Sequence, residues 1–294
     1  ASMADSAYHD ALHRLFSRTG GAWRLGLERV SELLALLGDP HRAYPVFHVA
    51  GTNGKGSTVA TLDAMLRGSG LRVGRYTSPH LVDFAERVVV DGAPMPHEAI
   101  TAWLNQWEPE MTRLGATFFE ATTAMALDWF AVQRVDVAIV EVGLGGRLDA
   151  TNTVQPLAAA VTQIGFDHQE FLGDSLASIA GEKAGIYKSG AVAVVGEARP
   201  DVCALLTARA EEARAEPVLV TGRDWQVREV SVGSAGTSFT LVTSDGERRL
   251  TTPLIGEFQA HNAGVALAML RGAGGRWLEI ERNAAALLPG VRLA

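Results

Sequence analysis

Apolar positions along the chain follow two periods, one typical of strands and one typical of helices. Short apolar runs at 46–50, 135–142, 157–164 and 191–195 have the length and composition of strands buried on both faces. Stretches with helical spacing lie at 57–67, 122–133 and 260–270. Strands that alternate with helices predict an α/β fold with a mostly parallel sheet flanked by helices.

Three regions depart from this alternation. The first forty residues predict helix, with apolar positions 25, 27, 30, 33, 34 and 37 before a stop at Gly38-Asp39-Pro40. The run 88–90 ends at Asp91-Gly92, a dipeptide typical of hairpins. From 217 to 255, short alternating segments around glycine turns predict a small antiparallel β patch.

Composition narrows the class of protein. The 294 residues, 47% of them hydrophobic, are enough for one large domain spanning 1–294. The net charge of -7 argues against a general nucleic-acid binder, and no apolar run reaches the roughly 20 residues that span a bilayer. Cys203 is the single cysteine, which excludes an intrachain disulfide. We therefore expect a cytoplasmic monomer with neither a nucleic-acid nor a membrane partner.

The segment HVAGTNGKGS at 48–57 is the strongest chemical signal. A buried strand leads into a glycine-rich turn, and a helix is expected to start at Ser57. Glycines let backbone N–H groups converge on phosphate oxygens, and the helix start adds partial positive charge. Lys55 would face the β- and γ-phosphates and the Ser57 hydroxyl a magnesium ion. Gly56 separates the two, unlike in the common P-loop, but an ordinary βα turn needs no lysine.

Candidate partners for a metal follow the next two strands. Glu141 ends one apolar run and His168 follows another, so both are expected at the carboxyl edge of the sheet. A histidine in this place is equally often a packed residue. Lys183, by spacing alone, predicts a solvated lysine at a helix end. The glycines at 143–146 form no dinucleotide fingerprint, because Leu148 occupies the third glycine position.

Six ordered motifs carry a resemblance to a known family. They are HVAGTNGKGS (48–57), YTSPHL (76–81), ERVVV (86–90), VEVGLGGRLDATN (140–152), Asp167-His168, and EKAGI (182–186). In this order they resemble folylpolyglutamate synthase/dihydrofolate synthase, a branch of the Mur ligase superfamily. The resemblance covers nearly the whole chain.

The resemblance implies a role for each matching residue. Asn53, Gly54, Lys55, Gly56 and Asn262 match ATP-binding positions, to which the loop pattern adds Ser57. Ser78, Glu141 and His168 match magnesium ligands, and Lys183 a lysine that is carbamylated in the family. Lys55, Lys183 and His168 are the catalytic candidates. Positions matching the pterin-bearing substrate site are Ala22, Trp23, Arg24, Leu25, Thr117, Phe118, Phe119, Glu120, Leu148, Asp149 and Ala150.

The implied reaction transfers the γ-phosphate of ATP to a substrate carboxylate, and L-glutamate then attacks the acyl phosphate. The acceptor is dihydropteroate, a reduced folate, or both. The family continues into a second α/β domain, which we expect to be missing here, leaving weak or no turnover. A Mur-type peptidoglycan ligase and a nucleotide-binding module without turnover stay open. A simple phosphotransferase or GTPase is disfavoured, because Gly56 is inserted and no Asn-Lys-x-Asp motif occurs.

Overall fold

The computed structural model describes residues 3–18 and 25–293. It contains an eight-stranded sheet of order β4-β3-β2-β5-β1-β6-β7-β8, which confirms the expected α/β architecture. The pairs from β2 to β8 are parallel, while β3 and β4 add an antiparallel edge. The strands are β1 (Val46–Ala50), β2 (Val73–Tyr76), β3 (Val88–Val90), β4 (Ala93–Pro94), β5 (Val137–Glu141), β6 (Ala158–Val161), β7 (Val192–Val195) and β8 (Val218–Val220).

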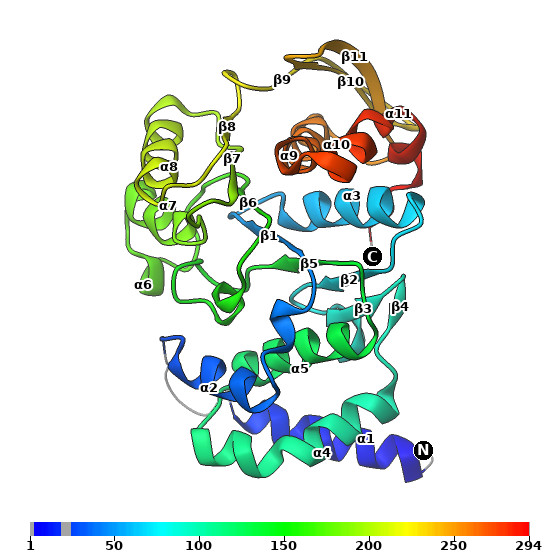
Figure 1. Cartoon of the computed structure of the whole chain (residues 1–294), viewed down its shortest axis with the longest axis vertical. Helices are drawn as coiled ribbons and strands as arrows, with labels where there is room; N and C mark the ends of the chain where they lie inside the picture. Colours follow the sequence, from blue (N-terminus) through cyan, green and yellow to red (C-terminus); the bar gives the residue numbers. More distant parts are fainter. Residues whose placement is uncertain (1–2, 19–24, 294) are drawn as a thin grey trace.

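Helices cover both faces of this sheet (Figure 1). One face packs against α3 (Lys55–Gly68) and α9 (Glu257–Ala273), extended by α10 (Gly275–Arg282) and α11 (Ala284–Leu287). The other face packs against α5 (Phe118–Val132), α7 (Leu176–Ala184) and α8 (Pro200–Glu212). Beyond α5 lie α1 (Met3–Ser17), α2 (Glu28–Leu36) and α4 (His97–Leu114). Short helical turns are α6 (Gln169–Leu172), η1 (Pro40–Arg42), η2 (Phe84–Arg87), η3 (Ala150–Thr153) and η4 (Leu288–Gly290).

A separate three-stranded antiparallel sheet lies over α9. Its strands are β9 (Gln226–Gly233), β10 (Gly236–Thr243) and β11 (Gly246–Thr252). The antiparallel patch expected at 217–255 is therefore shorter than predicted. Its first segment, β8, pairs parallel with β7 and extends the main sheet. The short turn after α8 brings the chain back alongside β7. An alternating apolar pattern does not reveal which sheet a short strand joins.

Local signals explain some of the helix starts. Helix α5 begins four residues before the expected 122, because the Thr117 hydroxyl accepts from the Glu120 N–H while the Glu120 carboxylate accepts from Thr117 N–H. Helix α3 begins at Lys55 rather than Ser57. Asp91-Gly92 forms the expected turn between β3 and β4. Within the part of the chain described, no helix is both long and apolar enough to cross a membrane.

Candidate functional site

The strand order places the predicted residues along one edge of the sheet. The neighbours β2, β5, β1 and β6 are parallel, so their carboxyl ends meet at the same edge. Ser78 lies just beyond β2, Glu141 ends β5, Lys55 follows β1, and His168 follows β6. The crevice outside these ends is where ligands bind in open parallel sheets. Topology thus arranges all four residues in sequence along this edge.

The phosphate loop joins β1 to the start of α3. Gly54 adopts φ +89, and a Cβ there would lie 2.3 Å from Oδ1 of the buried Asn262. A residue with a side chain is therefore excluded at 54. Asn262, which matches an ATP-binding position of the family, lies directly against this loop. Asn53 and Gly56 are exposed, and Ser57 is half-buried in the first turn of α3. Their N–H groups lie at a helix start, the arrangement that binds phosphate.

Two lysines converge on one backbone oxygen of this loop. The Lys55 ammonium donates to the Gly51 carbonyl at 2.7 Å, and the Lys183 ammonium lies 3.4 Å from the same oxygen. Burial and the charge of Lys55 lower the pKa of Lys183 to about 8. Lys183 is 2% exposed, so the solvated helix-end lysine expected from spacing alone is wrong. Helix α7 packs against the 143–152 loop, and this loop encloses the last turn of α7, which carries Lys183.

That enclosure depends on a close backbone approach. A Cβ on Gly146 would lie 2.8 Å from the Glu182 carbonyl and 2.9 Å from the Lys183 carbonyl. The Arg147 N–H donates to the Glu182 carbonyl at 2.8 Å, and the Asn152 amide donates to the Arg147 and Gly185 carbonyls. The glycines of GLGGRLDATN thus let this loop hold the end of α7, with Lys183 pointing at the phosphate loop.

Glu141 is a buried carboxylate beside these lysines. It is 4% exposed and accepts a 3.3 Å hydrogen bond from the Ser78 N–H. Burial raises its pKa, against the lowering effects of Lys55 and the Ser78 hydrogen bond. No described residue forms an ion pair with it. A buried carboxylate with so little compensation has the character of a cation ligand.

His168 lies at the outer end of the site. It has φ 43, its side chain is 49% exposed, and its Nε2 lies 3.2 Å from Asp167 Oδ1. The other Asp167 oxygen lies 3.9 Å from the Lys183 ammonium. Asp167 therefore links two catalytic candidates, although it was not among the predicted site residues. Its place directly before His168 in the sequence is a weak signal that could have indicated it.

The donor set fits magnesium in part. Magnesium prefers oxygen ligands, which Glu141 and the Ser78 hydroxyl supply, whereas His168 would add a nitrogen. Within residues 3–18 and 25–293, no group of three His, Cys, Asp or Glu side chains is placed so that it could hold a metal ion. A cation here would therefore bind few protein ligands and depend on phosphate oxygens and water, as magnesium does in nucleotide sites.

Asp149 and Ala150, two of the positions matched to the substrate site, are both buried. Asp149 Oδ1 accepts from the Leu144 N–H at 2.8 Å, and Oδ2 accepts from the Thr151 N–H and hydroxyl. The Thr151 hydroxyl in turn contacts His48 Nε2 at 2.9 Å, beneath the phosphate loop. Both Asp149 oxygens are thus used to shape the 144–152 loop. The spacing of residues could not show this role of Asp149, because it depends on how the loop folds two N–H groups and one hydroxyl around the carboxylate.

The Thr117–Glu120 segment has a mixed outcome. Glu120 is buried and receives the Arg29 guanidinium at 2.7 Å, so this carboxylate anchors α2 to α5. The ring of Phe118 stacks on Phe16 with 5.2 Å between centroids. Phe119 lies against Gly143 and edge-on to Tyr76, beside the end of β5. The two rings lie near the strand tips, while Thr117 and Glu120 cap the helix.

A small cleft of about 70 Å³ connects two further predicted positions. Leu25, which is 51% exposed, and Leu148 line it together with Gly146, Phe171 and Leu172. The cleft lies beside the loop that encloses Lys183. Ala22, Trp23 and Arg24, predicted next to Leu25, lie outside the described residues.

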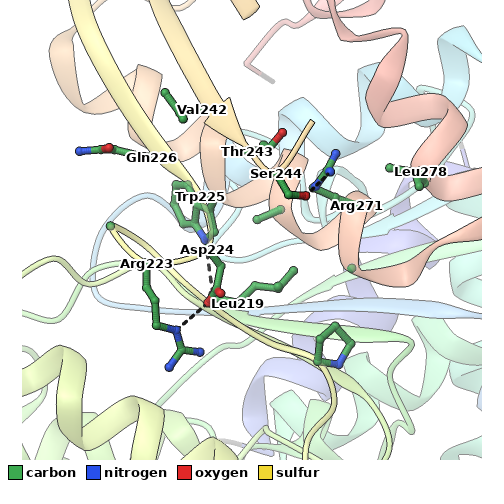
Figure 2. A pocket seen from close by; sticks show the side chains of 14 residues that line it. Leu219, Arg223, Asp224, Trp225, Gln226, Val242, Thr243, Ser244, Arg271 and Leu278 are labelled. Carbon is green, nitrogen blue, oxygen red and sulfur yellow. Dashed lines mark hydrogen bonds and ion pairs between the residues drawn. The ribbon is translucent and has the colours of Figure 1, made fainter. Parts of the chain in front are cut away.

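A roomier pocket of about 580 Å³ lies elsewhere (Figure 2). It is lined by β8, the end of β10 and the C-terminal half of α9, including Arg271 and Gly272. Asn262, near the other end of α9, is the residue that faces the phosphate loop. Arg223 bonds to Asp224, and Arg271 to Ser244 and Asp245, so the charged groups lining this pocket are paired. The catalytic candidates are all absent from its lining.

Comparisons with known proteins agree with this geometry. Residues 49–270 match the Mur ligase middle domain. The chain is 42% identical over 275 residues to the dihydrofolate synthase/folylpolyglutamate synthase of Escherichia coli, covering 90% of the chain and 61% of that protein. It is 39% identical over 270 residues to the Bacillus subtilis enzyme of the same name, covering 89% and 63%. The chain thus spans about three-fifths of these two relatives.

Solved structures give the same picture. The apo form of L. casei folylpolyglutamate synthase is 32% identical, with a TM-score of 0.89, covering 97% of the chain and 72% of that structure. Mycobacterium tuberculosis folylpolyglutamate synthase complexed with ADP is 36% identical, with a TM-score of 0.85, covering 97% and 66%.

Proposed function

The chain belongs to the folylpolyglutamate synthase/dihydrofolate synthase family of Mur ligases, and from this premise we propose that it binds ATP for amide-bond formation with L-glutamate. The acceptor is dihydropteroate, a reduced folate, or both. The observation that carries the proposal is the convergence of Lys55 and Lys183 on the Gly51 carbonyl, beside the buried Glu141. The Lys55 cation and a helix start at one loop favour a polyphosphate, and the buried Glu141 beside them favours its metal ion.

The position of each residue along the sheet edge determines its proposed role. Lys55 and the N–H groups at the start of α3 bind the β- and γ-phosphates, and Asn262 lies against the same loop. Ser78, Glu141 and His168 would hold magnesium, which neutralises phosphate charge when bound. Because the amide-forming step itself is mostly positioning, the rigid strand tips supply the orientation.

The proposed reaction has two steps, and each step forms one bond and breaks another. A carboxylate oxygen of the acceptor attacks the γ-phosphorus, and the bond to the leaving ADP oxygen breaks. The amino nitrogen of glutamate then attacks the acyl carbon and loses a proton, and phosphate leaves. Lys55 offsets the negative charge that develops on the transferred group.

The side-chain amine of Lys183 is placed for a covalent modification. Its pKa of about 8, set by burial and Lys55, leaves part of the amine neutral near neutral pH. A neutral amine attacks carbon dioxide and loses one proton, which gives a carbamate anion. We propose this modification for Lys183, since it replaces a buried cation beside Lys55 with an anion able to bind a metal ion.

Titration calorimetry with ATP tests the binding, in the presence and absence of magnesium. Mass spectrometry of reactions containing ATP, glutamate and dihydropteroate tests the chemistry. We expect magnesium-dependent ATP binding and a product heavier by one glutamyl residue. ATP binding without product would assign the chain a nucleotide-binding role alone. Turnover with a UDP-linked muramyl peptide instead of dihydropteroate would contradict the folate assignment, and absence of ATP binding would refute the whole proposal.

A further inference from the structure

Arg87 is a buried cation that the proposed reaction has not yet used. It ends η2 at the start of β3 and is 8% exposed. Its guanidinium carbon lies 5.2 Å from the ring centre of Phe118 and 6.0 Å from that of Phe84. Its Nε donates to Nδ1 of His80 at 2.8 Å. The rings fix the plane of the guanidinium, and His80 fixes its rotation in that plane.

Two partly buried arginines elsewhere in the described residues have carboxylate partners. Arg75 pairs with Asp63 at 3.2 Å and Arg29 with Glu120 at 2.7 Å. Arg87 forms no ion pair with any described residue, and its two Nη groups donate no hydrogen bond to one. Both Nη atoms are absent from the set of buried polar atoms that lack a hydrogen-bond partner, so each keeps contact with solvent. The outer edge of the guanidinium is therefore open, and a nine-tenths buried cation without a counter-ion favours an anion there.

The position of Arg87 identifies which part of the site this anion would occupy. The sheet order is β3-β2-β5-β1, so the tip of β5 with Glu141 lies between Arg87 and the phosphate loop. The Arg87 carbonyl also accepts from the Thr77 N–H at 3.1 Å, next to Ser78.

We propose that the open edge of Arg87 binds the acceptor carboxylate, the group that receives the γ-phosphate. This inference rests on the proposed function and names the residue that selects an acid as acceptor. A carboxylate matches the planar fork with two parallel hydrogen bonds. The neighbouring rings of Phe118 and Phe84 suit an acid attached to an aromatic group. Phosphate already has Lys55 and the start of α3 on the far side of Glu141.

His80 completes this subsite. Its Nδ1 accepts from Arg87, so its proton resides on Nε2. Nε2 can therefore donate one hydrogen bond to the same anion that Arg87 binds. Arg87 and His80 thus present donors to an anion while the rings exclude water from one side.

Paired ligands test the inference. Calorimetry compares pteroate with pteroic carboxamide, which has the same rings but no negative charge, on the wild type, Arg87→Gln and Arg87→Lys. We expect Arg87→Gln to weaken pteroate binding by about ten- to a hundredfold and to leave the carboxamide unchanged. Arg87→Lys keeps the charge without the fork and falls between the two. Arg113→Gln, an exposed arginine of α4 paired with Glu110, is the control for loss of one positive charge.

The outcomes separate this inference from the proposed function. Equal weakening of acid and carboxamide in Arg87→Gln assigns Arg87 a structural role and overturns the inference. Unchanged pteroate binding overturns it too, while Mg-ATP binding at the wild-type Kd leaves the proposed function intact. A wild type that binds neither Mg-ATP nor pteroate overturns both.

Discussion

Two regions of the molecule bury charged side chains, and they treat those charges differently. At the carboxyl edge of the sheet, Lys183, Glu141 and Arg87 are buried with weak or no ion pairing. At the far end of α9, Glu281 is fully buried and contacts the guanidinium groups of Arg248 and Arg271. Asn262 and Arg271 are nine residues apart, which is about 14 Å along the helix. One helix therefore touches both regions.

The difference shows where charge serves folding and where it serves a ligand. Glu281 connects α10 to β11 and α9, so its cations compensate the cost of its burial. At the strand tips, compensation by protein groups is incomplete, and Lys55 and Lys183 repel each other. Such an arrangement lowers stability, and it is relieved when a polyphosphate and a cation bind. We expect mutations to affect stability in one region and binding in the other.

The largest expected effect is that of Lys55→Met. Lys55 is half-buried and makes one hydrogen bond to its own loop, so unfolding free energy should change by less than about 0.5 kcal/mol. The Kd for Mg-ATP should rise by about a hundredfold or more, because a charge-assisted contact to phosphate is lost. Calorimetry and denaturant unfolding measure the two quantities. An unchanged Kd would remove Lys55 from the phosphate site.

Glu281→Gln should lower the stability of the fold and leave the Kd for Mg-ATP unchanged, the opposite of Lys55→Met. The amide keeps the shape but leaves Arg248 and Arg271 without their buried counter-ion, which should cost about 2–3 kcal/mol of unfolding free energy. Arg248 and Arg271 keep some contact with solvent, which holds the loss below that of a fully buried pair. Urea unfolding measures it, and Mg-ATP affinity of the folded variant is the control. A Kd that changes with stability would mean that the two regions are coupled through α9.

Lys183→Met sharpens the comparison through pH. The pKa of Lys183 falls from 10.5 to about 8 on folding, so the folded state binds fewer protons than the unfolded state between these values. The stability cost of the charged lysine is present below pH 8 and disappears as pH rises toward 10.5.

In buffer free of bicarbonate, Lys183→Met should therefore be more stable than the wild type by on the order of 1–2 kcal/mol at pH 7. The gain should shrink above pH 8. Thermal unfolding at a series of pH values measures this. A gain that is constant from pH 7 to 10 would show that Lys183 is not buried as a cation.

Local patterns predicted the parts of this fold that depend on near neighbours. The strands at 46–50 and 191–195 and the hairpin at Asp91-Gly92 were recognisable because strand burial and turn geometry are encoded in a few adjacent residues. The phosphate loop was recognisable for the same reason. The family motifs then indicated Ser78 and Asn262, which no local pattern distinguishes.

Other features depended on groups far apart in the chain. The burial of Lys183 depends on the approach of Gly146, and β8 joined the parallel sheet because of its partner β7. Asp149 was predicted at a substrate site, and the structure adds that its oxygens accept hydrogen bonds from groups of its own loop. Arg87 and Asp167 carried no signal strong enough to single them out.

The sequence by itself determined the order of strands and helices, the phosphate loop after the first strand, and the family. These follow from periodicity and short motifs, whose physics is local. Only the tertiary structure decided which charges have partners, because a counter-ion or a carbonyl can come from anywhere in the chain. Lys183 beside Lys55, Glu141 without an ion pair and the open edge of Arg87 are consequences of how distant segments pack, and on them the chemistry depends.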